Sequence, residues 1–212
     1  MKLFIVRHAE GASYTENWQS PDISLSDKGK RQAEALAGLQ RIKLAEIVIS
    51  SNWARAKETA EIATKGLGKQ IDTISDIEER HQSSKIYGLS RTSEVSKNYS
   101  KDLIKNYSDW NWKWDSEEES FDEVCKRAIK FRDYLIKNYQ QKNVLIFSHE
   151  TFIRLLISIC IFGDNYQNKY FRKFYRSTVI EPTSVSLIIY REQTNTWKLW
   201  YLNDYSHLSL VR

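Results

Sequence analysis

The sequence predicts an α/β fold built on an open, mostly parallel sheet. Three short apolar runs, at residues 3–6, 46–49 and 144–147, are rich in β-forming residues, and each stops at charged or polar residues. Stretches with helical periodicity lie between the runs. In such sheets, ligands gather beyond the carboxyl ends of the strands, where loops meet helix N-termini with free backbone N–H groups. The positions that directly follow the runs are therefore the first candidates for chemistry.

The same periodicities predict the remaining elements. Ser26 and Ser120 are placed to cap helices, and the helix after Ser120 is long and amphipathic. The helix expected last is apolar on most faces. The expected helices lie at 26–40, 54–63, 120–136 and 151–162, a short strand lies at 71–74, and the runs 184–190 and 196–201 form a hairpin at a sheet edge.

Two segments lack a strong strand or core pattern. Residues 83–118 contain few aliphatic side chains and many Ser, Lys, Asn, Tyr and Trp, and we expect a helical insertion that caps the top of the sheet. Its aromatic side chains either line a pocket or, as we favour, pack within the insertion. Residues 166–176 alternate basic and aromatic side chains, which suggests either nucleic-acid contact or, as we favour, a solvated helix or loop.

Length and composition indicate an ordinary globular protein. The 212 residues fit one domain with a cap insertion, and the 41% hydrophobic and 28% charged content is typical of this class. The net charge of +5 is spread along the chain, which suits small anionic substrates as well as nucleic acid. Two cysteines in apolar helical patterns indicate buried thiols in a reducing compartment. The first apolar run is too short for a signal peptide, so we expect a cytoplasmic protein without membrane or nucleic-acid partners.

Charged side chains stand at four of the predicted strand ends. They are Arg7 with His8, Arg55, Glu79 and His149. Two guanidinium groups and a second imidazole would form a cradle for a phosphoryl group, whose charge needs neutralising during transfer. The acidic residues are not spaced as metal ligands and there is no Walker-type glycine loop, so neither metal nor cofactor is expected.

His8 is the expected nucleophile of this cradle. Adjacent positive charge disfavours protonation of the imidazole, which leaves a ring nitrogen free to attack phosphorus. The leaving oxygen needs a proton, and a carboxyl group beside the bound phosphate can supply it. Glu79 is the expected donor.

These residues resemble the histidine phosphatase superfamily, in its phosphoglycerate-mutase-like branch, and the resemblance covers nearly the whole chain. Six segments carry it in the family's order. They are RHAE at 7–10, LSDKGKRQA at 25–33, SSNWARAKETA at 50–60, EESFDEVCKRA at 118–128, LIFSHETFIRLL at 145–156 and LNDYSHL at 202–208.

The resemblance implies a three-layer α/β/α sandwich that works without a metal. A phosphohistidine would form on His8 and be hydrolysed by water, with Arg7, Arg55 and His149 binding the phosphoryl group. Glu79 would be the proton donor, with Glu78 as the nearby alternative. Asn17 and Arg80 are further candidates for substrate contact, although Asn17 lies farther from the first histidine than the family's asparagine does.

The sequence also departs from the family pattern. Glu150 replaces the glycine expected after the second histidine, and its charge either weakens phosphate binding or points outward without effect. The segment HQSSKIYG at 81–88 replaces a glycine-rich stretch after Glu79, and Glu118 replaces the glycine before Glu119 and Ser120.

A phosphatase for a small phosphorylated metabolite is the favoured function. The alternative is a phosphoglycerate-type mutase, which the triplet Glu-Arg-His at 79–81 resembles, but the segment after it is shorter than in mutases. A third hypothesis is a non-catalytic module that binds a phosphorylated ligand. The observation that suggests it is Glu150, whose charge could weaken the phosphate site. Substrate specificity is expected to reside in residues 83–118 and in the loop at 11–22, and the sequence gives no indication of oligomeric state.

Overall fold

The computed structural model describes residues 1–163 and 166–210, and within them six strands form one mixed sheet in the order β3-β2-β4-β1-β5-β6. The first four strands in this order run parallel, and the last two are antiparallel at one edge. The strands are β1 (Lys2–Arg7), β2 (Ile47–Ser50), β3 (Ile71–Thr73), β4 (Asn143–Ser148), β5 (Val185–Arg191) and β6 (Thr196–Asp204). The predicted mostly parallel sheet and its C-terminal hairpin are confirmed.

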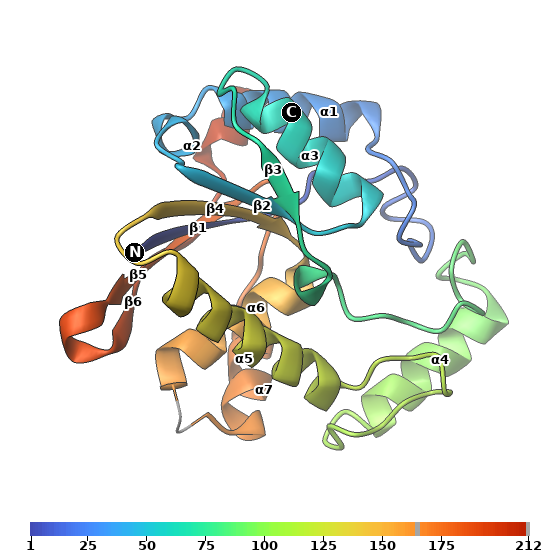
Figure 1. The fold of residues 1–212 in the computed structure, drawn as a ribbon. Coiled ribbons are helices and arrows are strands. Elements are labelled where there is room, and N and C mark those ends of the chain that lie inside the picture. The colour runs from blue at the N-terminus through green and yellow to red at the C-terminus, as the bar shows by residue number, and fades with distance from the viewer. Residues whose placement is uncertain (164–165, 211–212) are drawn as a thin grey trace.

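Helices cover both faces of this sheet. Figure 1 shows α1, α2 and α3 on one face and α5, α6 and α7 on the other, which is the expected α/β/α sandwich. The helices are α1 (Asp27–Ala37), α2 (Gln40–Lys43), α3 (Ala54–Thr64), α4 (Glu94–Lys105), α5 (Phe121–Asn138), α6 (Glu150–Phe162) and α7 (Asn168–Ser177). No helix within the described residues is both long and apolar enough to cross a membrane.

The helix starts follow the predicted caps. The Ser26 side chain accepts a hydrogen bond from Gly29 N, and Ser120 forms a reciprocal capping box with Glu123. The first helix ends earlier than predicted. It stops at Ala37, before Gly38, and a separate short helix begins at Gln40. Glycine disfavours helix continuation because its backbone loses more freedom on ordering than that of other residues.

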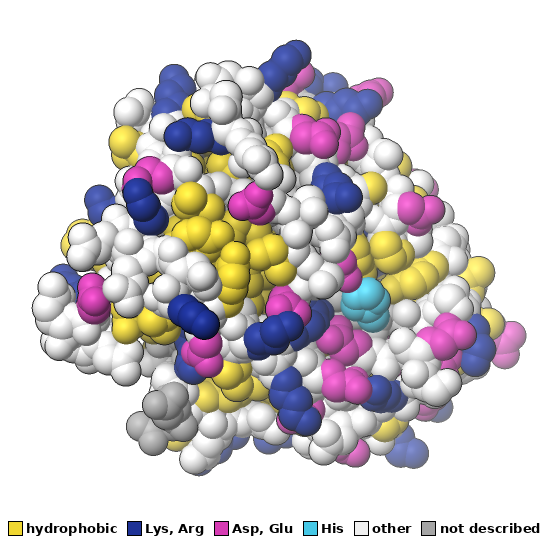
Figure 2. Space-filling view, in the orientation of Figure 1, with side chains coloured by type: hydrophobic (Ala, Val, Ile, Leu, Met, Phe, Trp, Pro, Cys, Tyr) yellow, Lys and Arg dark blue, Asp and Glu magenta, His cyan; other side chains and the backbone are white. Residues whose placement is uncertain are grey.

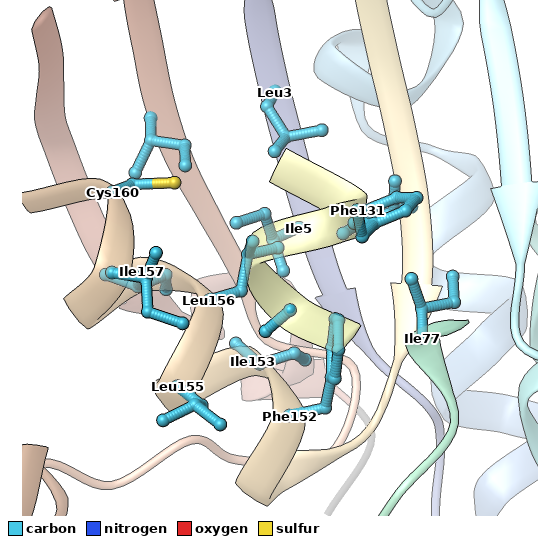
Figure 3. Packing of buried hydrophobic residues seen from close by; sticks show 14 of the residues in the cluster. Leu3, Ile5, Ile77, Phe131, Phe152, Ile153, Leu155, Leu156, Ile157 and Cys160 are labelled. Carbon is cyan, nitrogen blue, oxygen red and sulfur yellow. The ribbon is translucent and has the colours of Figure 1, made fainter. Parts of the chain in front are cut away.

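The middle four residues of each of the two central strands, β1 and β4, are apolar because both faces of the sheet are covered. Successive side chains of β1 point to opposite faces, so Leu3 and Ile5 join the core under α5 and α6, whereas Phe4 and Val6 join the core under α1–α3. Figure 3 shows Leu3 and Ile5 packed with residues of α5 and α6, including Phe131. Each such side chain contributes about 1.5–3 kcal/mol when fully buried. This packing fixes the ends of β1 and β4 side by side.

The insertion at residues 83–118 contains α4 and lies beyond the carboxyl ends of the parallel strands (Figure 1). Its aromatic side chains are mainly used in packing, as favoured, but not only within the insertion. Tyr99 contacts Trp114 and also Trp18 of the loop at 11–22, and Trp110 packs on Phe121 of α5. The insertion is therefore anchored to both sides of the strand ends.

The segment at 166–176 forms most of α7. Phe171 is buried in the core, and Phe174 and Tyr175 pack against it, so the aromatic side chains serve the protein's own packing. Of the expected solvated helix or loop, the structure shows a helix, and its aromatic side chains are packed rather than solvated. Figure 2 shows Lys and Arg side chains interspersed with Asp and Glu across the visible face, rather than gathered into one basic surface.

Candidate active site

Two histidines meet where β1 and β4 end. These strands are parallel neighbours in a register that pairs Arg7 with Ser148, so the residues that follow them, His8 and His149, come side by side. Their ring centroids are 4.9 Å apart with planes at 56°. The structure therefore brings together two imidazoles that are 141 positions apart in the sequence (149 − 8).

The hydrogen bonds of His8 define its tautomer. Nδ1 lies 2.7 Å from the carbonyl oxygen of Ala9, which can only accept, so Nδ1 carries the hydrogen. Nε2 is then the unprotonated nitrogen, and it accepts a hydrogen bond from Arg55 Nε over 3.0 Å. Thr59 supports both partners: its hydroxyl accepts from Ala9 N and donates to the carbonyl of Arg55.

Both imidazoles are held in the neutral form. Burial lowers the pKa of His8 well below 6.5, and the charges of Arg55 and Arg7 lower it further. The pKa of His149 is lowered in the same direction, again by burial first and then by Arg55. A neutral imidazole has the lone pair that a nucleophile needs, so His8 is electronically suited to attack.

His149 has one paired and one unpaired ring nitrogen. Its Nε2 lies 2.8 Å from Ser51 Oγ, and its Nδ1 is buried without a hydrogen-bond partner among the described residues. Ser51 Oγ accepts a hydrogen bond from Trp53 N, which leaves the serine hydroxyl able to donate to His149. The Trp53 ring packs against the imidazole at 4.9 Å and holds its plane.

Arg7 is almost fully engaged by the protein. It is 6% exposed and donates to the carbonyl of Ile180 and, over 2.7 Å, to the Tyr14 hydroxyl. The same terminal nitrogen is 2.9 Å from Glu150 Oε2. Only Nε of this guanidinium is buried without a partner among the described residues.

Arg55 lies in the first turn of α3, as predicted, and is 4% exposed. Besides the bond to His8, it donates to the carbonyl of Ser20 over 2.9 Å. Burial lowers the pKa of Arg55 to about 10, with the charge of Arg7 acting in the same direction and that of Glu79 opposing it. The group therefore stays cationic at neutral pH.

Of the two candidate proton donors, the structure brings Glu79 to the site. Its carboxylate accepts from the backbone N–H groups of Thr151 and Phe152 at the N-terminus of α6, over 3.1 and 3.3 Å. Glu78 instead lies 2.9 Å from His81 and does not line the cavity beside His8.

The two further substrate candidates differ. Arg80 lines the cavity, but its guanidinium donates to the Tyr99 hydroxyl over 2.8 Å and pairs with Glu118 over 3.0 Å, so it also ties the insertion to the site. The structure does not bring Asn17 to the cavity wall. Asn17 forms an isolated bridge with Ser90 of the insertion, whereas its loop neighbours Tyr14, Trp18 and Gln19 line the cavity.

A cavity of about 330 Å³ opens above His8. Sequence reasoning placed specificity in the loop at 11–22 and in the insertion, without naming residues, and both segments do contribute to the wall. Arg91 lies over the Trp18 ring, 4.3 Å from its centroid, and forms no ion pair within the described residues. The wall residues that sequence reasoning missed are Tyr14, Trp18, Gln19, Trp53, Gln82, Arg91, Leu103, Phe121, Thr151 and Tyr175.

Glu150 points into this cavity rather than outward. Its carboxylate lies between two guanidinium groups, 2.9 Å from Arg7 and 2.5 Å from Arg154. Of the two alternatives for this departure from the family pattern, the structure excludes the outward orientation.

The arrangement can hold a tetrahedral anion beside a neutral imidazole. In residues 1–163 and 166–210, no cluster of three or more His, Cys, Asp or Glu side chains is placed to hold a metal ion. An α/β sandwich with two histidines and an arginine at the ends of its central strands, and a second arginine in the helix turn beside them, is typical of the class of metal-independent histidine phosphatases.

The family model of the histidine phosphatase superfamily (branch 1) matches residues 3–203. The chain therefore belongs to this superfamily, and the resemblance seen in the sequence is confirmed. In a comparison with curated proteins, none matches the chain.

Solved structures share the fold at low sequence identity. The alpha-ribazole phosphatase from Shigella flexneri is 20% identical with a TM-score of 0.76, covering 97% of each chain. A mycobacterial glucosyl-3-phosphoglycerate phosphatase is 18% identical with a TM-score of 0.78, covering 95% of this chain and 98% of the other. An H9A mutant of the phosphoserine phosphatase from Entamoeba histolytica, in complex with phosphoserine, is 22% identical with a TM-score of 0.74, covering 98% of each. At these identities the likeness shows the fold alone.

Proposed function

We propose that this protein hydrolyses small phosphomonoesters through a phosphohistidine formed on His8. The observation that carries the proposal is the unprotonated Nε2 of His8, which accepts a hydrogen bond from Arg55 Nε while the His149 ring lies 4.9 Å from the His8 ring. A nucleophile needs such a lone pair, and a transferring phosphoryl group needs donors around its oxygens.

Two buried nitrogens support phosphoryl binding at this place. Arg7 Nε and His149 Nδ1 have no hydrogen-bond partner among the described residues, and buried polar atoms rarely remain unpaired in native proteins. His149 is fully buried behind the cavity wall, so a phosphoryl oxygen would satisfy these nitrogens once it displaces the contacts that cover them. The bound group would also take over Arg55 Nε, which releases the lone pair of His8 for attack.

The reaction proceeds in two steps. His8 Nε2 forms a bond to phosphorus while the ester P–O bond breaks, and the leaving oxygen takes the proton of the Glu79 carboxyl group. Water then attacks the phosphohistidine and gives a proton to Glu79, and the N–P bond breaks to release phosphate and restore His8. Each step conserves charge and protons without a metal or cofactor.

The cavity favours a small substrate. Its volume of about 330 Å³ holds a phosphoryl group and a modest leaving group, with Trp18, Phe121 and Tyr175 as aromatic wall residues. Of the triplet at 79–81 that motivated the mutase alternative, Glu79 and Arg80 line the cavity and His81 does not. The buried, unpaired thiols of Cys125 and Cys160 support the cytoplasmic location that we propose.

A second candidate is a module that binds a phosphorylated ligand without turnover. The ion pair between Glu150 and Arg7 favours it, because it occupies a guanidinium that hydrolysis would use.

Hydrolysis of p-nitrophenyl phosphate by the purified full chain, with EDTA present, tests the proposal. We expect phosphate release by the wild type and its loss in His8→Ala, with His81→Ala as a matched histidine control. Acid-labile ³²P on the wild type but not on His8→Ala would identify the phosphohistidine. Phosphate binding with no turnover between pH 5 and 8 would leave the binding module as the function. A panel of phosphomonoesters, with 3-phosphoglycerate and a trace of the bisphosphate included, would define the substrate and detect mutase activity.

A further inference from the structure

Glu150 places a carboxylate inside the anion-binding site. It is the first residue of α6, directly after His149, and its side chain is 28% exposed into the cavity beside Arg7. A carboxylate and a phosphoryl oxygen are both anionic acceptors, so Glu150 on a terminal nitrogen of Arg7 and a phosphoryl oxygen on its Nε would compete for the charge of one guanidinium.

Neighbouring side chains fix the orientation of the Glu150 carboxylate. Arg154 lies one helical turn later and pairs with the other carboxylate oxygen over 2.5 Å. Arg154 is itself 6% exposed and lies 4.4 Å from the centroid of the Tyr175 ring. The ion pair with Arg154 therefore fixes the carboxylate of Glu150 in contact with Arg7.

The two guanidiniums nearest His8 are therefore unequal. The charge of Arg7 is partly offset by Glu150, which also pairs with Arg154, and the terminal nitrogen of Arg7 that contacts Glu150 also donates to Tyr14. Arg55 forms no ion pair with a carboxylate within the described residues and keeps its Nε on His8. An incoming phosphate dianion therefore meets Arg55, which has no carboxylate in direct contact within the described residues and feels the charge of Glu79 only at longer range, and Arg7, which is in direct contact with one.

We propose that Glu150 sets the affinity of the site for phosphate by competing with it for Arg7. The proposal rests on the phosphoryl site assigned above. Glu150 is a positioning residue that acts through Arg7: it weakens binding of the ground-state anions, and it speeds loss of the inorganic phosphate product. The effect is electrostatic, so it follows the charge of residue 150 rather than its size.

The test is direct binding of inorganic phosphate by isothermal titration calorimetry to the full chain at pH 7. We expect Glu150→Gln, which keeps the shape and removes the charge, to lower the Kd for phosphate about fivefold or more. Glu150→Gly should lower it in the same direction. Glu34→Gln, which removes one exposed negative charge from α1, is the matched control and should leave the Kd unchanged.

A second measurement distinguishes the loss of the Glu150 charge from misfolding of the variant. In p-nitrophenyl phosphate turnover, the Ki of inorganic phosphate should fall in Glu150→Gln in proportion to the Kd, and thermal unfolding should confirm that the variant is folded. A Kd that is unchanged or raised in the folded Gln variant would overturn the proposal, because Glu150 would then have no effect on phosphate binding or would assist it.

The calorimetric test does not depend on turnover. A wild type that binds phosphate but does not hydrolyse esters would therefore refute the proposed hydrolysis and still allow this test. A wild type and variant that both fail to bind 10 mM phosphate would refute the present inference.

Discussion

Arg55 Nε and His8 Nε2 form a 3.0 Å hydrogen bond between the first turn of α3 and the residue that follows β1. In the free protein, Arg55 donates to the lone pair of His8 that must attack phosphorus. During the proposed reaction, the same guanidinium must instead stabilise the charge on the phosphoryl oxygens. Substrate binding has to exchange this bond for one between Arg55 and a phosphoryl oxygen.

Replacement of Arg55 by lysine tests the need for a planar guanidinium. Arg55→Lys keeps a positive charge but lacks the two separate, coplanar nitrogens that contact His8 Nε2 and the Ser20 carbonyl. We expect kcat/KM for p-nitrophenyl phosphate to fall about 100-fold. Arg31→Lys on the exposed face of α1 is the control, and near-wild-type activity in Arg55→Lys would contradict the role proposed for the guanidinium.

The hydroxyl of Ser51 orients His149. Ser51→Ala removes the partner of His149 Nε2, so the imidazole loses the contact that fixes its tautomer, and Nδ1 is no longer held as the nitrogen that carries the hydrogen. We expect kcat to fall about tenfold with little change in KM. Steady-state kinetics measure both. Ser158→Ala, another buried serine, should change neither, and a fall confined to KM would show that Ser51 acts on binding alone.

Stability should fall as the pH drops below about 6.5. Burial lowers the pKa of His8 and His149 in the folded protein, whereas an unfolded histidine titrates near 6.5. Below that pH the unfolded chain binds protons that the folded protein does not, so the free energy of unfolding decreases. Urea unfolding at pH 7.5, 6 and 5 measures this. His8→Gln should show a smaller decrease than the wild type, and an equal decrease would mean that His8 is not the source.

The guanidinium of Arg91 should select substrates with a second anionic group. It lies at the cavity wall over Trp18 and forms no ion pair within the described chain. Arg91→Gln should raise KM about tenfold for a phosphomonoester that also carries a carboxylate, and should leave KM for p-nitrophenyl phosphate nearly unchanged. Arg31→Gln serves as the charge control. Equal effects on the two substrates would assign Arg91 a general role instead.

The capping box of α5 should contribute to stability independently of activity. Ser120→Ala removes the side chain that accepts from Glu123 N at the start of this 18-residue helix. We expect a loss of about 1 kcal/mol in the free energy of unfolding, measured with urea, and unchanged KM. Ser116→Ala, in an exposed turn outside any helix, is the control; a similar loss there would argue against a capping effect.

Local sequence patterns predicted the strands and helix starts that carry the site, because an unbroken apolar run indicates a strand that is covered on both faces of the sheet. The apolar runs of β1 and β4 and the caps Ser26 and Ser120 are found where expected. The predicted end of α1 is wrong. The helical spacing of side chains continues past Gly38 in the sequence, but the helix ends at Ala37.

The sequence by itself determined the fold class, the strand ends and the residues that stand on them, because periodicity, capping and the parallel-strand rule are local or nearly local. Only the tertiary structure decided that Glu79 rather than Glu78 faces the cavity, that Asn17 does not, and that Glu150 turns toward Arg7. These outcomes depend on side chains from different elements, such as the clamp of Arg154 on Glu150 and the bridge of Asn17 to Ser90. A side chain's direction follows the charges and loops packed around it, and no pattern along one segment contains that information.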